Sequence, residues 1–188
     1  MHMGGKSDKR LSGHRSDWEE LVAMLDPKSG DRIIDIGAGR GKKAARISQA
    51  FPGTELFAVD PSERRVAKAK RDYPSVRSTV AGAEKLPFED AFFDKAYSTM
   101  ALHHFSDLDR ALGEVARVVR PGGLYVVLEV EPGSSLGRLF RFFGRVVGER
   151  MQVVTEEQLS ARLGHVAGLH VVRSVRLGSR YLVQLQRT

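Results

Sequence analysis

The chain has 188 residues, of which 41% are hydrophobic and 28% charged, and its formal net charge is +7. This size and balance predict one folded domain over residues 16–188, preceded by a flexible basic arm at residues 1–15. The sequence contains no cysteine, which excludes disulfides, thiolate catalysis, iron–sulfur clusters and cysteine-ligated zinc.

Neither a membrane span nor a secretion signal is evident in the sequence. No apolar run approaches the roughly 18 residues that cross a bilayer, and the basic start lacks the apolar stretch of a signal peptide. We therefore expect a cytoplasmic protein without a transmembrane segment. The positive charge favours anionic partners, whether acidic small molecules, nucleic acid or lipid headgroups, but does not choose among them.

The first expected elements are a helix and a buried strand. Residues 16–19, Ser-Asp-Trp-Glu, form a capping box, and apolar residues at helical spacing follow until about Asp26-Pro27. Residues 33–36 are an apolar run suited to a strand that is buried on both faces of a parallel sheet. We place this strand at the centre of the fold.

Strands and helices then alternate along the chain. We expect helices at about 42–51, after Pro61-Ser62 and at 106–119, and strands at 55–60, 76–81, 94–98 and 124–130. This α/β order predicts a Rossmann-like, doubly wound and mostly parallel seven-stranded sheet with helices on both faces. Residues 170–177 and 180–186, joined by the hairpin signal Gly178-Ser179, predict an antiparallel C-terminal edge strand.

A glycine-rich turn, Asp-Ile-Gly-Ala-Gly-Arg-Gly at residues 35–41, follows the central strand. Ligands bind at this edge of an open α/β sheet, and glycine lets the backbone approach them. Lys42 stands where the dinucleotide fingerprint requires its third glycine, which argues against NAD. Asp60 ends the next strand at the spacing from which a carboxylate accepts hydrogen bonds from both ribose hydroxyls. The alternatives are a turn that serves packing alone and an Asp60 that only caps the following helix.

Five motifs follow one another between residues 33 and 130. They are Asp35-x-Gly37-x-Gly39-x-Gly41, Val59-Asp60, the run at 83–94, Leu102-His103-His104 and Arg120-Pro121-Gly122-Gly123. In this order and spacing the set resembles class I S-adenosylmethionine-dependent methyltransferases, closest to the UbiE-like, methyltransferase domain 11 group. The resemblance implies S-adenosyl-L-methionine as the cofactor and S-adenosyl-L-homocysteine as its product.

The resemblance also assigns residues to the methionine and ribose parts of the cofactor. Asp35 would hold the amino group, and Asp60 would bind the ribose hydroxyls. The backbone would approach both parts at Gly37, Gly39 and Gly41.

At the adenine, the resemblance implies that Pro61 flanks one face of the ring. Ala83, Glu84 and Leu86 would belong to the loop on the other face, with backbone groups pairing with the ring. Gly82 stands where the family often has an aspartate that accepts a hydrogen bond from the adenine amino group. Without it, affinity falls by about 1.5 to 3 kcal/mol unless Glu84 or a backbone carbonyl replaces the contact.

Methyl transfer from a sulfonium mainly needs an acceptor held in line with the methyl group, so the lack of a catalytic triad is no objection. Where the acceptor must lose a proton, His103 or His104 is the candidate catalytic base, because imidazole titrates near neutral pH. The alternative is that both histidines only line the cofactor pocket. The two adjacent histidines have no spaced third partner, so no metal site is expected.

Residues 132–154 form a connection longer than usual, which we expect to be a helical insertion or lid. One helical face would carry Leu136, Leu139, Phe140, Phe143, Val146 and Val147, and another Arg138, Arg141, Arg145 and Glu149. The apolar face is placed to cover the active site and the arginines to meet an anionic substrate or a lipid surface. The alternative is an amphipathic helix packed on the core with a solvated basic face.

The first functional hypothesis is methyl transfer to a small-molecule acceptor, anionic or apolar. An RNA or protein methyltransferase is favoured only by the positive charge, and residues 98–101 lack the Asn/Asp-Pro-Pro-Tyr/Phe sequence of nucleic-acid amino methylases. Nucleic acid is therefore not the favoured partner. A third hypothesis, a binding protein that holds S-adenosylmethionine without catalysis, is motivated by Gly82.

Overall fold

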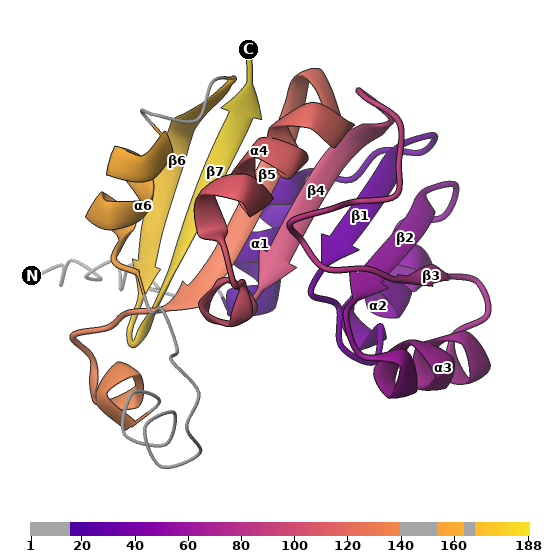
Figure 1. Cartoon of the computed structure of the whole chain (residues 1–188), viewed down its shortest axis with the longest axis horizontal. Helices are drawn as coiled ribbons and strands as arrows, with labels where there is room; N and C mark the ends of the chain where they lie inside the picture. The colour runs from indigo at the N-terminus through magenta and orange to yellow at the C-terminus, as the bar shows by residue number, and fades with distance from the viewer. Residues whose placement is uncertain (1–15, 140–153, 164–167) are drawn as a thin grey trace, which may run out of the picture.

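The computed structural model describes residues 16–139, 154–163 and 168–188 (Figure 1). Its helices are α1 (Asp17–Leu25), α2 (Lys42–Ala50), α3 (Glu63–Asp72), α4 (Leu108–Val118) and α6 (Glu156–Leu163), with a 3-10 turn, η1 (Leu102–His104). Its strands are β1 (Arg32–Ile36), β2 (Glu55–Asp60), β3 (Arg77–Val80), β4 (Phe93–Thr99), β5 (Val119–Val130), β6 (Leu169–Leu177) and β7 (Arg180–Arg187). The expected basic arm lies outside the described residues.

The strands form one seven-stranded sheet in the order β3-β2-β1-β4-β5-β7-β6. Strands β1 to β5 are parallel to their neighbours, whereas β7 pairs antiparallel with both β5 and the edge strand β6. The expected doubly wound sheet is confirmed, and the hairpin at Gly178-Ser179 supplies its antiparallel pairing.

Helices cover both faces of the sheet (Figure 1). The apolar residues of α1 and α2 pack with Ile33, Tyr97 and Val126 on one face. Those of α4 and α6 pack with Ile34, Tyr125 and other strand residues on the opposite face. β1 is therefore buried from both sides, as its apolar run predicts.

Local sequence signals set the boundaries of the elements. The capping box at the start of α1 is present in full, and α1 ends at Leu25, followed by the C-cap residue Asp26 in a left-handed conformation before Pro27. Ser62 caps α3. β5 begins at Val119, five residues earlier than expected, because Val119 already pairs with Phe93 before a shift in register.

The carboxyl ends of β1, β4 and β5 point to the same edge of the sheet (Figure 1). The long connection after β5 begins there with a helical stretch at residues 135–139, and its residues 140–153 lie outside the described part of the chain. The prediction of an insertion or lid over residues 132–154 thus stays a prediction. Within the described ranges, no helix is long and apolar enough to cross a membrane.

Candidate functional site

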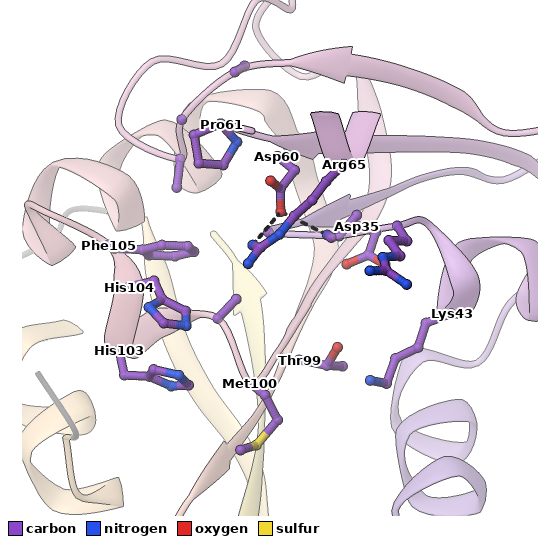
Figure 2. Close-up of a pocket in the computed structure, with 18 of the residues that line it drawn as sticks. Asp35, Lys43, Asp60, Pro61, Arg65, Thr99, Met100, His103, His104 and Phe105 are labelled. Carbon is purple, nitrogen blue, oxygen red and sulfur yellow. Dashed lines mark hydrogen bonds and ion pairs between the residues drawn. The ribbon is translucent and has the colours of Figure 1, made fainter. Parts of the chain in front are cut away.

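A cavity of about 960 Å³ lies at the carboxyl edge of β1, β2 and β4 (Figure 2). It is lined by the glycine-rich turn and the start of α2, by residues 60–65, by residues 81–84 and by residues 99–106. Nine of the sequence-predicted residues line it: Asp35, Gly37, Gly39, Asp60, Pro61, Ala83, Glu84, His103 and His104. Gly41 and Leu86 are not among the lining residues.

The first two glycines of the turn serve different needs. Gly37 has a φ of +79°, and a Cβ at this position would lie only 2.5 Å from the Cβ of Ala101. Gly39, with a φ of +58°, has nothing within 4 Å of a Cβ position. Gly37 therefore allows the turn to pack against the segment after β4, whereas Gly39 presents open backbone to the cavity.

Gly41 supports packing of the helices behind the turn. Its φ is +71°, and a Cβ there would approach the Cβ of Ala69 in α3 at 3.2 Å. Gly41 thus provides a close contact between the start of α2 and α3, and its approach to the cofactor stays a prediction.

Asp60 ties the end of β2 to the turn and to α3. Its Oδ2 accepts the Gly39 N–H at 2.9 Å, and its Oδ1 accepts the Ser62 N–H at 3.0 Å. The Arg65 guanidinium lies 3.7 Å from Oδ2. Ser62 provides the side-chain cap of α3, so the contact of Asp60 with Gly39 shows a role beyond helix capping. Each oxygen of the Asp60 carboxylate still has a lone pair that can accept a hydrogen bond from a ligand.

Asp35 places a buried carboxylate at the wall of the cavity. Its Oδ2 accepts the Tyr97 hydroxyl at 2.9 Å, whereas Oδ1 is buried with no hydrogen-bond partner among the described residues. Burial raises the pKa of Asp35 to about 7, against the lowering effects of the Tyr97 hydrogen bond and of Lys43, while Asp60 adds to the rise. A buried carboxylate with an unmatched oxygen is a site for a cation that the protein itself does not supply.

Lys43, from the first turn of α2, was not among the predicted site residues. Its side chain extends into the cavity near Asp35 and Thr99 (Figure 2). The cavity wall there pairs a carboxylate with an ammonium group, which is complementary to the head of a zwitterionic amino acid. The sequence offered no specific signal, because a lysine near a helix start is usually solvated.

Glu84 fastens the loop after β3 to the start of α4. Its Oε1 accepts the Ser106 N–H at 2.7 Å, the Ser106 hydroxyl at 2.8 Å and the Asp107 N–H at 3.3 Å. Burial raises the pKa of Glu84, but hydrogen bonds, including these, outweigh it and the pKa is lowered. A Cβ on Gly82 would lie 2.9 Å from Glu84 Oε2, so the glycine leaves room for the glutamate.

Leu86 lies beneath this loop, not at the cavity. Its N–H donates to Glu114 Oε2 at 2.7 Å, and its carbonyl accepts from Arg117 at 2.9 Å. Both backbone groups are thus engaged by α4, and the side chain is buried. These contacts give Leu86 a structural role in the loop, and its assignment to the adenine stays a prediction.

The two adjacent histidines differ sharply in environment. His103 is buried and its Nδ1 lies 3.0 Å from Glu129 Oε1, whereas His104 is exposed. Glu129 is fully buried in β5 and was not predicted, although a charged residue within the apolar run at 124–130 is a signal that could have found it. No group of three or more metal-ligating side chains occurs in the described part of the chain.

Residues 34–127 match the methyltransferase domain family. The chain is 35% identical over 133 residues to demethylmenaquinone methyltransferase of Thermus thermophilus, covering 67% of this chain and 60% of that protein. It is 32% identical over 144 residues to malonyl-[acyl-carrier protein] O-methyltransferase of Pectobacterium atrosepticum, covering 77% and 56% respectively. The chain thus spans somewhat more than half the length of these curated relatives.

A solved structure also shares the fold. Geranyl diphosphate C-methyltransferase of Streptomyces coelicolor, determined with S-adenosyl-L-homocysteine, matches with a TM-score of 0.77 and 18% identity. The match covers 91% of this chain and 79% of that one. At this identity the likeness shows the fold alone.

Proposed function

Because this chain belongs to the methyltransferase domain family, we propose that its cavity binds S-adenosylmethionine and that the protein transfers the methyl group to a small-molecule acceptor. The observation that carries the proposal is the unmatched, buried Oδ1 of Asp35 beside Lys43 in a cavity that also contains Asp60. The cavity volume, about 960 Å³, is within the range of cofactor sites.

The methionine head of the cofactor fits the Asp35 end of the cavity. Asp35 Oδ1 accepts a hydrogen bond from the α-ammonium group, which supplies the missing positive charge. Lys43 holds the α-carboxylate at the positive N-terminal end of α2. Each is a charge-assisted hydrogen bond, stronger than a neutral one.

The adenosine fits the opposite end, where Asp60, Pro61 and Phe105 are grouped (Figure 2). Asp60 accepts hydrogen bonds from the ribose hydroxyls through its remaining lone pairs. The Pro61 and Phe105 rings supply apolar surface to the base. Glu84 Oε2, beside Gly82, accepts from the adenine amino group in place of an aspartate at position 82.

When bound, S-adenosylmethionine supplies an electrophilic methyl group on its sulfonium sulfur. The protein binds this methyl donor through Asp35, Lys43 and Asp60. It holds the acceptor beside Thr99, Met100 and the histidines, in line with the methyl–sulfur bond. The connection at residues 132–154 starts at the same edge of the sheet, and its role as a lid stays a prediction because residues 140–153 lie outside the described residues.

A small-molecule acceptor is supported by the names of relatives, which include a demethylmenaquinone methyltransferase and a 27-O-demethylrifamycin SV methyltransferase. Four cations, Arg40, Lys42, Lys43 and Arg65, line the cavity and favour an acceptor that is neutral or anionic. The cytoplasmic location expected from the sequence stays a prediction.

Replacing Asp60 with alanine tests the proposed cofactor-binding site. We expect Asp60→Ala to weaken S-adenosylhomocysteine binding by about tenfold to a hundredfold, because hydrogen bonds to a charged group contribute about 1.5 to 3 kcal/mol. Isothermal titration calorimetry measures the change, with NAD as a control ligand. Asp109→Ala removes a carboxylate that is 60% exposed on α4, away from the cavity, and serves as the matched control. Wild-type binding of NAD in preference to the sulfur ligands contradicts the proposal.

A further inference from the structure

Tyr97 contacts the carboxylate of Asp35 from the neighbouring strand. The two residues are register partners in the parallel pair of β1 and β4, so their side chains lie on the same face of the sheet. The Tyr97 hydroxyl donates to Asp35 Oδ2 at 2.9 Å, and both residues are buried. A buried phenol is thus joined to the carboxylate that we assign to the ammonium group of the cofactor.

The hydroxyl of Tyr97 is not needed to fill the core. Tyr97 belongs to the apolar cluster that includes Ile33, Val126 and Leu182, where a phenylalanine ring would supply the same apolar surface. A buried hydroxyl costs free energy unless it has a hydrogen-bond partner, and the partner here is Asp35. Within the described ranges, Tyr97 is the only donor of a hydrogen bond to the Asp35 side chain.

This contact determines which oxygen of Asp35 stays available to a ligand. Because Oδ2 accepts the Tyr97 hydroxyl, Oδ1 is the oxygen that is buried without a partner. The carboxylate cannot rotate about its Cβ–Cγ bond without breaking the contact with Tyr97. Oδ1 is therefore held in one position and does not exchange places with Oδ2.

The same contact favours the ionised form of Asp35. Burial raises the pKa of Asp35 to about 7, whereas the hydrogen bond from Tyr97 lowers it, because a donated hydrogen bond stabilises the carboxylate. Burial, with Asp35 as neighbour, also raises the pKa of Tyr97 well above its usual value of 10. The phenol therefore keeps its proton and acts only as a donor.

Three elements place ionisable groups around Asp35. They are β4 with Tyr97, α2 with Lys43 and β2 with Asp60, of which Lys43 lowers the pKa of Asp35 and Asp60 raises it through their charges. Lys43 and Asp60 line the cavity, and we assign both to the cofactor, whereas Tyr97 is not among the lining residues. Tyr97 can therefore be changed without removing a group that touches the ligand.

We propose that Tyr97 is a positioning residue for the methyl donor, because it keeps Asp35 ionised and holds Oδ1 in place for the α-ammonium group. This inference rests on the proposed methyltransferase function. When the ammonium group binds, Asp35 gives up any proton that it carries, and this proton passes to the solvent. Without Tyr97, Asp35 would keep its proton up to a higher pH, and cofactor binding would have to displace it.

Removal of the Tyr97 hydroxyl tests this role through the pH dependence of binding. We expect Tyr97→Phe to weaken S-adenosylhomocysteine binding about tenfold to a hundredfold at pH 6, but by no more than about fivefold at pH 8.5. The reason is that the loss of the hydrogen bond leaves Asp35 protonated at pH 6, whereas alkaline pH restores the carboxylate. Isothermal titration calorimetry at the two pH values measures both ratios.

Tyr125→Phe is the matched control. Tyr125 is also fully buried, in the neighbouring strand β5, but its hydroxyl donates to Ser98 Oγ at 2.9 Å. This substitution removes the same atom without removing a hydrogen bond to Asp35, so we expect its affinity relative to wild type to be the same at both pH values. Tyr97→Phe overturns the proposal when it binds like wild type at pH 6. An equal loss at both pH values would show a merely structural role and also overturns it.

A double-mutant cycle shows whether Tyr97 acts through Asp35. Asp35→Asn has no carboxylate to ionise at position 35. In this background we expect Tyr97→Phe to change S-adenosylhomocysteine binding by no more than about a few fold at either pH, because coupled residues have non-additive effects. A further tenfold loss at pH 6 in the double variant contradicts the proposed route through Asp35.

Proton release on binding gives a second readout. At pH 8 Asp35 of the wild-type protein is mostly ionised before the ligand binds, since its pKa is about 7. Calorimetry at pH 8 in two buffers of different ionisation enthalpy should therefore show little net release from wild type, but about half a proton or more from Tyr97→Phe. Equal release from the two proteins contradicts the proposal. Absence of binding to the wild-type protein at every pH instead removes the proposed function on which the inference rests.

Discussion

Asp35→Asn is expected to raise the free energy of unfolding of the ligand-free protein at pH 8 while weakening cofactor binding. The native pKa of Asp35, about 7, lies above its usual value of 3.8 because the carboxylate is buried. The native state therefore binds the proton more tightly than the unfolded chain, and stability is lost as pH rises from about 4 to 7. Above that range the ionised side chain costs on the order of 4 kcal/mol.

Asparagine removes this cost because it is neutral and its carbonyl still accepts the Tyr97 hydroxyl. Urea unfolding should show a gain of a few kcal/mol at pH 8 that shrinks as the pH falls, with little change left at about pH 4, where the unfolded chain also begins to bind the proton. Calorimetry at pH 8 should show S-adenosylhomocysteine binding weakened about tenfold to a hundredfold, because the charged partner of the ammonium is lost.

Asp94→Asn is the control, for which we expect a change in the free energy of unfolding of the opposite sign. Burial raises the pKa of Asp94, but the hydrogen bonds from the Arg32 N–H and the Arg120 guanidinium outweigh it, so the pKa is lowered. Ionised Asp94 therefore stabilises the fold, and its replacement should lower the free energy of unfolding at pH 8. Equal losses of stability in the two variants would contradict the assignment of Asp35 as an unmatched carboxylate.

Gly37→Ala is expected to be strongly destabilising. The new Cβ would lie 2.5 Å from the Cβ of Ala101, and the φ of +79° is unfavourable for any residue with a side chain. The left-handed conformation costs about 1 to 2 kcal/mol, and forced displacement of a packed neighbour costs about 1 to 3 kcal/mol more. We expect a loss of roughly 2 to 5 kcal/mol in urea unfolding.

Alanine substitutions at two other glycines separate the cost of the left-handed conformation from the cost of displacing a packed neighbour. Gly178 has a φ of +59° with nothing within 4 Å of a Cβ, so Gly178→Ala measures the conformational cost alone. Gly39→Ala should cost a similar amount of stability, but it should also weaken S-adenosylhomocysteine binding, because its Cβ points into the cavity. A Gly37→Ala variant no less stable than Gly178→Ala would show that the contact with Ala101 does not restrict position 37.

The spacing of apolar residues and the residues that mark the ends of helices and strands were sufficient to predict the fold. Three of the four residues at 33–36 are isoleucines, which favour a buried strand, and Ser16 and Ser62 mark helix starts through a side chain that satisfies backbone N–H groups. These signals are local, so they need no knowledge of the partner segments. The start of β5 was missed because Val119 belongs to the sheet only through its pairing with Phe93.

The candidate site was predicted less completely, because its details depend on contacts between distant segments. Gly41 resembles the other two glycines in sequence, yet it faces Ala69 of α3 and not the cavity. Leu86 was assigned to the adenine, but Glu114 and Arg117, about 30 residues later, engage its backbone. His103 contacts Glu129, from the next strand, and no local pattern joins them.

Calorimetric titration with S-adenosylhomocysteine at pH 6.5, in two buffers of different ionisation enthalpy, tests the central claim most directly. Asp35 is largely protonated at this pH in the free protein, since its pKa is about 7, and it must ionise to pair with the ligand's ammonium group. We predict one site per chain and the net release of about half a proton or more. Absence of binding, or binding with the same heat in both buffers, would contradict the assignment of this cavity as the seat of the methyl donor.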